Sequence, residues 1–296
     1  MSAPLAVVTV TYSPGEHLDA FLESLRDATT RPVSVILADN GSTDGAPEAA
    51  EAAYDHVRLL RTGANIGYGG AANRAVAEVD PATEFVMVVN PDVQFGPGSI
   101  DELLAAAERH PRAGSLGPLI LEPDGSRYPS ARRVPDLTSG SLHALLGSVW
   151  PSNPWTQRYR QDNDEVSERS VGWLSGSCQL LRRAAFDSVD GFDSRYFMYM
   201  EDVDLGDRLG RAGWTNIYVP TAVVTHAKGH AAGRHPESML PAHHRSAYRF
   251  QADRHPRRWQ APLRWTLRAG LALRSRVVVT AALRQRDDTV GPGSSS

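Results

Sequence analysis

The chain has 296 residues, of which 41% are hydrophobic. A chain of this size and composition can bury a sizeable core, which excludes disorder for its bulk. The formal charge of -3 and the pI near 6.4 provide no general basic field. Nucleic acid is therefore not expected as a partner.

The chain has one cysteine, Cys178, so it can form no internal disulfide. A single cysteine fits a protein of a reducing compartment. Cys178 is interpreted as a buried small residue rather than a nucleophile. No positively charged segment precedes Leu5, and no apolar run approaches the ~18 residues that span a bilayer. We therefore expect a cytoplasmic protein.

Strand and helix patterns alternate along the first half of the chain. This order predicts an α/β fold with a doubly wound, mostly parallel sheet flanked by helices. Ser99 is the expected N-cap of the last of these helices. Strands are expected at 6–12, 34–39, 57–61 and 85–90, and helices at 17–27, 47–54, 71–79 and 99–108.

The second half is less regular. Residues 123–170 are rich in Pro, Ser, Arg and Trp, which predicts loops and short helices over the sheet edge. A helix is expected at 201–212, where Val203, Leu205 and Leu209 have the spacing of a core-facing stripe. Further expected elements are a strand-like run at 172–183, a helix at 184–188, and closing strands at 216–220 and 222–226.

The apolar run at 85–90 ends in Asn-Pro-Asp. Proline has no N–H to donate to a sheet, so Asp92 is expected at the carboxyl end of a strand. Ligands bind at that edge of open α/β sheets, and a carboxylate is a suitable ligand for a divalent cation. The segment predicts a metal-assisted nucleotide site.

Two other segments could contact a nucleotide. Asp39, at the end of the second strand, could accept an N–H from thymine or uracil, with Thr11 and Tyr12 on the opposite side; an ordinary turn aspartate is the alternative. Asn65, Gly67 and Gly69 precede the helix expected from Ala71, where small residues would admit a ligand, or simply form a tight turn.

Six ordered motifs resemble the inverting GT-A glycosyltransferases of the large family 2. They are VVTVTY (7–12), LADNGSTDG (37–45), NIGYGGAANR (65–74), VNPDV (89–93), GWLSGSC (172–178) and YMEDVDLGDRLGRAGW (199–214). The resemblance covers roughly residues 5–235. It is strongest with actinobacterial enzymes that move rhamnose from dTDP-rhamnose to polyprenyl-diphosphate-linked N-acetylglucosamine during synthesis of the arabinogalactan–peptidoglycan linker of the cell wall.

This resemblance implies a Mg²⁺ or Mn²⁺ ion that neutralises the leaving diphosphate. It carries over Asp92 and His226 as metal ligands. Asn90 stands where the family usually has an acid, so the protein alone should bind the ion weakly. Arg234 would bring positive charge to the diphosphate from a loop, although a solvated loop is an equal alternative.

The resemblance also assigns the acid pair at the start of the helix expected at 201–212. Asp202 matches the general base of an inverting transfer, and Glu201 would orient the base or the acceptor. On the residues alone, Glu201, Asp202, Asp204 and Asp207 could instead be a solvated helix start.

Four residues are candidates for the acceptor pocket. Trp173 could stack on a sugar, and Ser175, Gly176 and Ser177 form a turn that permits close approach. Each could equally serve packing.

The chain is expected to divide into a catalytic domain (1–235), a helical, arginine-rich extension (236–288) and a disordered tail (289–296). Nine arginines lie between Arg254 and Arg286. With Trp259, Trp265 and the leucines at 263, 267 and 271, they favour a peripheral helix on an anionic membrane, or a helix docked on the catalytic domain. The oligomeric state is left open.

Two alternatives to rhamnose transfer remain at this stage. The same machinery could use another donor sugar, such as galactofuranose or mannose, because the Asp39 contact does not separate thymine from uracil. The chain could also be a non-catalytic scaffold that binds nucleotide sugars. The joint presence of Asp92, Glu201, Asp202 and His226 argues against the scaffold.

Overall fold

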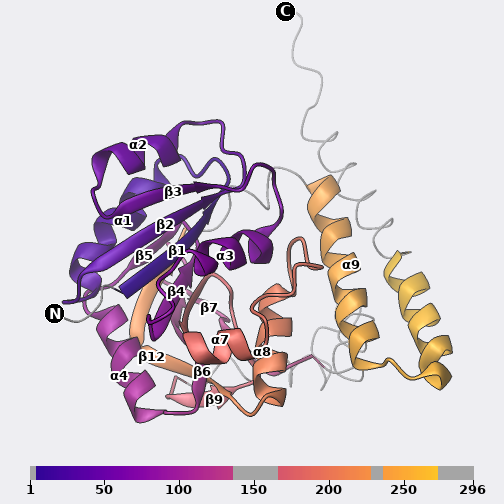
Figure 1. The fold of residues 1–296 in the computed structure, drawn as a ribbon. Helices are drawn as coiled ribbons and strands as arrows, with labels where there is room; N and C mark the ends of the chain where they lie inside the picture. Colours follow the sequence, from indigo (N-terminus) through magenta and orange to yellow (C-terminus); the bar gives the residue numbers. More distant parts are fainter. Residues whose placement is uncertain (1–4, 136–165, 228–235, 273–296) are drawn as a thin grey trace, which may run out of the picture. The chain divides into compact units, whose positions relative to one another are not determined.

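The structure is a computed structural model that describes residues 5–135, 166–227 and 236–272 (Figure 1). The chain divides into two compact units, one comprising Met1–Arg195 and Glu201–Lys228, the other Tyr196–Met200 and Gly229–Ser296. The expected domain boundary at residue 235 stays a prediction. Arg234 and the tail 289–296 lie outside the described residues.

The first unit is built on a mixed sheet, ten-stranded within the described residues, whose main path runs β3-β2-β1-β4-β11-β6-β12-β5. Strands β8 (Ala131–Arg132) and β10 (Trp173–Leu174) form a separate antiparallel pair. The strands of the main sheet are β1 (Leu5–Thr11), β2 (Val33–Asp39), β3 (Val57–Arg61), β4 (Phe85–Val89), β5 (Val93–Phe95), β6 (Ala113–Leu121), β7 (Arg127–Tyr128), β9 (Arg169–Val171), β11 (Cys178–Arg182) and β12 (Thr215–His226).

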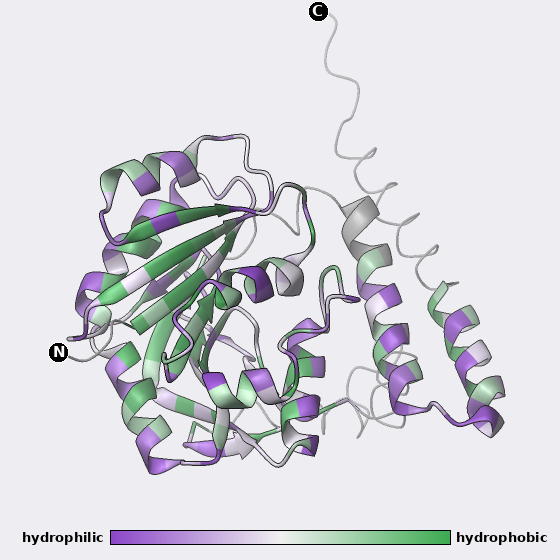
Figure 2. Cartoon of the chain, viewed as in Figure 1, coloured by the Kyte–Doolittle hydropathy of each residue, from purple (hydrophilic) through white to green (hydrophobic). Residues whose placement is uncertain are grey.

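Helices cover both faces of this sheet because successive strand residues point to opposite sides. Val7 and Met87 pack with α1 (His17–Ala28), α2 (Ala46–Ala53) and α4 (Ser99–Arg109). Val8 and Val88 pack with α3 (Tyr68–Ala77), α7 (Arg183–Ser188) and α8 (Glu201–Arg211). The central strands are accordingly hydrophobic along their length (Figure 2).

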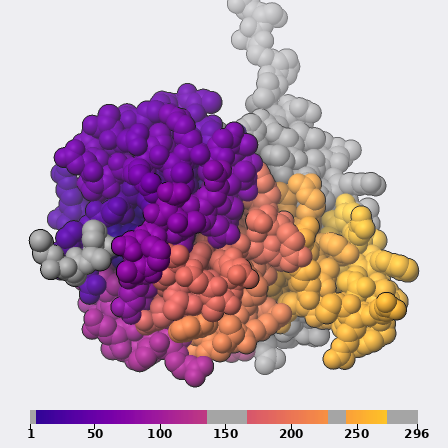
Figure 3. Space-filling view, viewed as in Figure 1, coloured from indigo at the N-terminus to yellow at the C-terminus, as the bar shows by residue number. Residues whose placement is uncertain are grey.

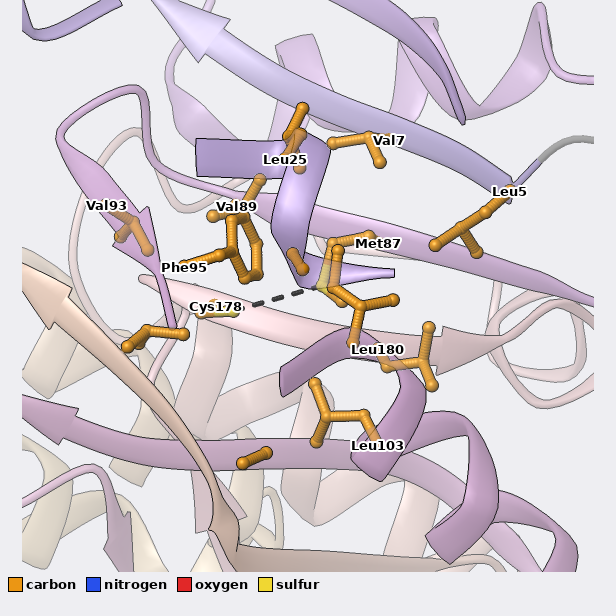
Figure 4. Close-up of a cluster of buried hydrophobic side chains, with 14 of the residues drawn as sticks. Leu5, Val7, Leu25, Met87, Val89, Val93, Phe95, Leu103, Cys178 and Leu180 are labelled. Atoms are coloured by element: carbon orange, nitrogen blue, oxygen red, sulfur yellow. Dashed lines mark hydrogen bonds between the residues drawn. The ribbon is translucent and has the colours of Figure 1, made fainter. Parts of the chain in front are cut away.

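The first cluster contains the lone cysteine (Figure 4). Cys178 is buried beside Met87, with their sulfur atoms 3.9 Å apart. Burial raises the pKa of its thiol well above the usual range. A thiol held in this neutral form is a poor nucleophile, so the prediction of a buried structural residue is confirmed.

The expected elements of the first half are present, with one shifted start. Helix α3 begins at Tyr68, three residues before the prediction, because Gly67 adopts a left-handed φ of 82° and its carbonyl accepts the first helical hydrogen bond from Ala71. Gly69 is therefore helical and not part of a loop. A Cβ on Gly69 would lie 2.8 Å from Cβ of Phe192, so this glycine serves helix packing.

In the α4–β6 region one prediction was wrong and one strand was missed. Gly98, with φ 68°, is the N-cap of α4, whereas Ser99 is its first residue and is buried. Strand β6 was not expected, because Gly114, Gly117 and Pro118 interrupt its apolar pattern. Both glycines permit close packing, since an added Cβ would meet Trp214 and Leu174 at about 2.9 Å.

Other differences lie in the second half. The closing strands expected at 216–220 and 222–226 form one strand, β12, with a register shift between Val219 and Val223. The described part of 123–170 contains the short strands β7 and β8 and the start of β9, where loops and short helices were expected. The run at 172–183 is split into β10 and β11 by a turn. Helix α8 and its buried stripe of Val203, Leu205 and Leu209 are confirmed.

The second unit contains α9 (Pro236–Arg254), a 3-10 turn η1 (Arg258–Gln260) and a helix over residues 261–272. Segment 196–200 packs on α9, where the Ser246 hydroxyl donates to the Met198 carbonyl at 2.9 Å. Arg264 donates to the carbonyls of His255 and Arg257, which ties the last helix to the end of α9. Among the described residues, none of the helices has the length and apolar character needed to cross a membrane.

Candidate active site

Strand direction brings several polar segments to one edge of the first unit's sheet. Strands β1, β2 and β4 are parallel, so Thr11, Asp39 and Asn90 end at that edge. β11 runs antiparallel to β4, which places the turn before Cys178 there as well. β12 is parallel to β6, so its last residue, His226, reaches the same edge. In the space-filling view, the indigo-to-purple and orange segments of this unit pack directly against each other (Figure 3).

Asp39 is the most heavily bonded carboxylate at this edge. It accepts hydrogen bonds from the Thr11 hydroxyl at 2.9 Å and from the hydroxyl and N–H of Ser42. The Gly41 N–H lies 3.3 Å from the other carboxylate oxygen, Oδ2. The local structure of Asp39 is therefore that of a turn aspartate. Thr11 orients its carboxylate. Oδ2 receives only the two longer backbone bonds, so it keeps capacity for a further donor.

The loops after β1 and β2 are joined to each other. The Ser13 N–H donates to Ser42 and the Gly15 N–H to Asp44. Tyr12 stands next to this junction with 61% of its surface exposed. An aromatic ring so exposed can cover a flat ligand bound beside Asp39.

The loop before α3 is ordered by its own polar groups. The Asn65 side chain accepts the Gly67 N–H at 3.1 Å, and the Gly67 carbonyl accepts from Asn40 at 3.2 Å. Thr62 donates to the backbone carbonyl of Asp39 at 2.7 Å, which fixes this loop to the end of β2. The predicted contacts of Asn65 and Gly67 with a nucleotide remain predictions.

Asp92 and His226 form a pair across the β5–β12 ladder. Nε2 of His226 lies 3.1 Å from Oδ1 of Asp92, and His226 is paired in register with Val93. Burial acts to raise the pKa of Asp92, but the hydrogen bond and charge of His226 outweigh it and lower the pKa. Asp92 is therefore an anion at neutral pH.

Only one of the two ring nitrogens of His226, Nε2, contacts Asp92. Within the described residues, its Nδ1 is buried and has no hydrogen-bond partner. A carboxylate on one imidazole nitrogen with the other nitrogen free is a common arrangement of metal-binding histidines. In that arrangement the metal binds the other nitrogen, so His226 could supply one ligand, and Asp92 could add one through Oδ2, which His226 does not use. The described residues contain no group of three or more His, Cys, Asp or Glu placed to hold a metal, so further ligands must come from elsewhere.

The turn between β10 and β11 lies beside the Asn-Pro-Asp segment. The Asn90 N–H donates to the Ser177 carbonyl at 2.9 Å. Ser175 and Ser177 are buried and their hydroxyls bond to each other at 3.1 Å, so both brace the turn. Gly176 is the more exposed residue of the three.

Trp173 is half-buried on β10. Its indole N–H donates to the Arg133 carbonyl at 2.9 Å, and a Cβ on Gly206 would meet its Cβ at 2.7 Å. These contacts anchor Trp173 against α8. Contact of its ring with an acceptor sugar stays a prediction.

Glu201 and Asp202 begin α8, but they are not a solvated helix start. Glu201 is only 8% exposed, Asp204 is also buried, and Asp202 is half-buried. Burial, followed by the charge of Asp202, raises the pKa of Glu201 to about 8. Burial also raises the pKa of Asp202, and the N–H groups of Gly176 and Val203 counteract it. Desolvation thus outweighs the helix terminus, which would lower both values.

The two acids differ in the hydrogen bonds that would stabilise a charge. Oδ2 of Asp202 accepts the Gly176 N–H at 2.9 Å and Oδ1 accepts the Val203 N–H at 2.8 Å. Oε2 of Glu201 is buried without a partner among the described residues. These hydrogen bonds favour the charged form of Asp202 over that of Glu201, so within the pair Glu201 holds a proton more readily.

The backbone before this pair has an unusual conformation. Tyr199 and Met200 have φ values of 66° and 69°, in the left-handed region that residues other than glycine seldom adopt. Each such residue costs of order 1 kcal/mol, and positions of this kind concentrate at functional sites. They immediately precede Glu201 in the chain.

A doubly wound sheet whose polar edge carries an Asp–His pair and a buried acid pair is compatible with a glycosyltransferase of the GT-A class. The glycosyl transferase family 2 model matches residues 6–190, and the chain belongs to this family. It is 62% identical over 294 residues to the N-acetylglucosaminyl-diphospho-decaprenol L-rhamnosyltransferase of Mycobacterium tuberculosis (strain ATCC 25618 / H37Rv), covering 96% of each chain. It is 27% identical to the Escherichia coli (strain K12) rhamnosyltransferase WbbL, over 83% of this chain and 92% of that protein.

Solved structures support the fold. GalNAc-T7, crystallised with UDP, GalNAc and Mn²⁺, matches with a TM-score of 0.58 and 16% identity over 77% of this chain and 44% of that one. Residues 1–349 of Staphylococcus aureus TarS, in complex with UDP, match with a TM-score of 0.54 and 15% identity, over 83% and 64% of the two chains. The predicted fold class and family are confirmed.

Tyr68 was not singled out from the sequence. It stands in the motif NIGYGGAANR between the glycines that drew attention. Its hydroxyl donates to the Gly176 carbonyl at 2.7 Å, so it links α3 to the β10–β11 turn. The sequence feature that could have pointed to Tyr68 is its position between glycines, because small neighbours leave room for its ring.

Proposed function

We propose that this protein transfers L-rhamnose from dTDP-rhamnose to polyprenyl-diphosphate-linked N-acetylglucosamine, an early step of arabinogalactan–peptidoglycan linker synthesis. The observation that carries this proposal is the 62% identity, over 96% of both chains, to the mycobacterial N-acetylglucosaminyl-diphospho-decaprenol L-rhamnosyltransferase. Agreement along nearly the whole length supports a shared donor and acceptor better than a match confined to the nucleotide-binding half.

In this proposal the donor's base lies at the ends of β1 and β2. Oδ2 of Asp39 accepts the imide N–H of thymine, and the exposed ring of Tyr12 covers the base. The loop of Asn65 and Gly67 borders the ribose and diphosphate. These roles rest on the placement of the four residues at one sheet edge.

Asp92 and His226 fit a divalent cation as a partial ligand set, with Asn90 nearby as a neutral oxygen donor. Oxygen ligands from the donor diphosphate would complete the coordination, as is usual for Mg²⁺ held with substrate phosphates. When bound, Mg²⁺ or Mn²⁺ supplies positive charge that stabilises the departing dTDP. The Nδ1 of His226, which has no hydrogen-bond partner among the described residues, and the lowered pKa of Asp92 support this assignment.

Asp202 acts as the general base of a single, inverting displacement. One of its carboxylate oxygens takes the proton of the acceptor hydroxyl as the hydroxyl oxygen attacks the anomeric carbon of rhamnose. The bond from that carbon to the diphosphate oxygen breaks, and dTDP leaves on the opposite face. Glu201 stays neutral in the pair, so a single negative charge faces the reacting hydroxyl.

The acceptor's lipid points to a role for the second unit. Trp259 and Trp265 are 72% and 71% exposed, and basic residues at 257, 258 and 268 are exposed near them. Tryptophan beside arginine suits the headgroup region of an anionic membrane. Leu267 and Leu271 are half-buried, so the tryptophans replace the leucine stripe as the membrane-facing group.

A donor panel tests the proposed function. The purified protein would be incubated with a short polyprenyl-diphosphate N-acetylglucosamine and either dTDP-rhamnose, UDP-galactofuranose or GDP-mannose. We expect a rhamnosylated lipid from the first donor alone. Transfer from one of the other donors would replace the rhamnose assignment. Binding of nucleotide without turnover of any donor would favour the scaffold.

A further inference from the structure

Tyr68 reaches from the first turn of α3 to the turn that contacts the proposed base. Its hydroxyl donates to the Gly176 carbonyl at 2.7 Å. Its ring packs edge-on against Phe192, with centroids 6.0 Å apart, which limits the rotations open to the side chain. The hydroxyl is therefore presented at a fixed place.

Gly176 joins Tyr68 to Asp202. While its carbonyl accepts from Tyr68, its N–H donates to Oδ2 of Asp202 at 2.9 Å. A Cβ on Gly176 would lie 3.3 Å from Cβ of Asp202 and 3.7 Å from Cε1 of Tyr68. Both side chains thus lie against this one residue, and any side chain here would press on the base.

Other hydrogen bonds of the turn involve the residues on either side of Gly176: the Cys178 N–H donates to the Ser175 carbonyl at 3.4 Å, and the Ser177 N–H donates to the Ser175 hydroxyl at 3.3 Å. Ser175 and Ser177 bond to each other, and the Ser175 N–H bonds to the Ser130 carbonyl. These contacts secure the two ends of the turn. The contact of Tyr68 secures its middle, where the donor to Asp202 is located.

We propose that Tyr68 is a positioning residue that acts through Gly176 to hold Asp202 in the orientation and charge state of the general base. This inference rests on the proposed function of Asp202. In this proposal, Tyr68 does not touch the reacting atoms. Its hydroxyl holds the Gly176 carbonyl, which restrains the backbone of Gly176, and the Gly176 N–H stabilises the Asp202 carboxylate.

The electrostatic surroundings keep Tyr68 in its donating form. The acidic groups that act on it are Glu201 and Asp202 of α8, Cys178 of β11 and Asp92 of the β4–β5 turn. Burial, followed by the charges of Glu201 and Asp202, raises the pKa of Tyr68 well above its usual value. Its hydroxyl therefore keeps its proton, and the hydrogen bond, across the working pH range.

The test is Tyr68→Phe, which removes the hydroxyl and keeps the ring. We expect kcat to fall by about 10- to 100-fold, the range reported for small misplacements of catalytic groups, with a donor KM within about 2-fold. With its N–H donor loosened, Asp202 should ionise less readily, so the acidic limb of the kcat/KM profile should move up by about half a pH unit or more.

Tyr54→Phe is the matched control. Tyr54 lies at the end of α2 beside His56, away from this turn, and its loss of a hydroxyl should leave kcat and the pH profile unchanged. Thermal unfolding of both variants reports any loss of fold. A Tyr68→Phe protein that unfolds earlier but keeps the wild-type acidic limb would show a merely structural role and overturn the proposal.

Asp202→Asn separates this inference from the proposed function. If Asp202→Asn retains transfer, Asp202 is not the base and the proposed mechanism fails. If Asp202→Asn is inactive while Tyr68→Phe behaves as wild type, only the role of Tyr68 fails. In the Asp202→Asn background, Tyr68→Phe should cause no further loss of the residual rate, because both changes remove the same function.

Discussion

Glu201 and Asp202 are adjacent in sequence, but their carboxylates have different surroundings. Two backbone N–H groups hold Asp202, whereas one oxygen of Glu201 is buried without a partner among the described residues. The difference divides the acid pair into a neutral and an anionic member. This difference supports the proposed role of Asp202, and not Glu201, as the general base.

Glu201→Gln should make the protein more stable at slightly alkaline pH. The pKa of Glu201 is about 8 in the folded protein against 4.5 as a free side chain. Between these values the unfolded chain releases a proton that the folded protein keeps, so stability falls as pH rises. Glutamine removes this loss, and we expect a gain of about 1 to 3 kcal/mol at pH 8.

Unfolding measured from pH 5 to pH 8.5 checks this expectation. The wild type should lose stability over that range more steeply than Glu201→Gln, with the remaining slope due in part to Asp202. Glu23→Gln, on the exposed side of α1, is the control and should follow the wild type. Equal slopes for wild type and Glu201→Gln would show that Glu201 is not held neutral.

Sequence reasoning located individual residues better than their contacts. The resemblance placed Asp92 and His226 together, and the structure brings them within 3.1 Å. The burial of Ser175 and Ser177 was not predictable, because it depends on how β10 and β11 meet. Tyr68 was missed for the same reason, since its partner Gly176 lies 108 residues away in the chain.

At the scale of elements, the proposed metal site would be formed by the β4–β5 turn and the end of β12. Because these elements supply few ligands, Mg²⁺ or Mn²⁺ should bind weakly to the nucleotide-free protein and at least about 10-fold more tightly with dTDP present. Calorimetric titration of the ion with and without dTDP measures this. In the Asp92→Asn variant, added dTDP should no longer tighten the binding of the ion. Tight binding without nucleotide would contradict the partial ligand set.

The two exposed tryptophans of the second unit should determine membrane binding. Replacing Trp259 and Trp265 by serine should weaken sedimentation with anionic vesicles by about 10-fold or more, because burial of the rings contributes much of the binding energy. Val166→Ser, which removes an exposed apolar side chain of the first unit, is the control. Unchanged sedimentation of the double variant would exclude this surface.

Elements were predictable where hydrophobic periodicity was uninterrupted. Strand β3 was predicted with its exact bounds, and α1, α4 and α8 to within a residue or so. Strand β6 was missed because its glycines and proline are typical of turns, yet here they admit Leu174 and Trp214. Such cases depend on partners distant in the chain, which a local pattern does not contain.

At the scale of the whole molecule, the first unit supplies a complete GT-A sheet and the second an exposed aromatic and basic surface. The proposed lipid-linked acceptor would need both a reaction centre and access to a membrane, and we propose the first unit for the one and the second unit for the other. The family and the fold were predictable because six motifs kept their order along the chain. The pairing of β11, β6 and β12 was not predictable. In this part of the sheet β11 runs antiparallel to β4 and β6, whereas β12 runs parallel to β6.

The most direct measurement is rhamnose transfer from dTDP-rhamnose to a short polyprenyl-diphosphate N-acetylglucosamine by wild type and Asp202→Asn, with Mg²⁺ and after chelation. We predict turnover by the wild type with Mg²⁺, a rate at least about 1,000-fold lower for Asp202→Asn with unchanged dTDP binding, and little turnover after chelation. Asp202→Asn activity near that of the wild type, or full activity without a divalent ion, would contradict the account.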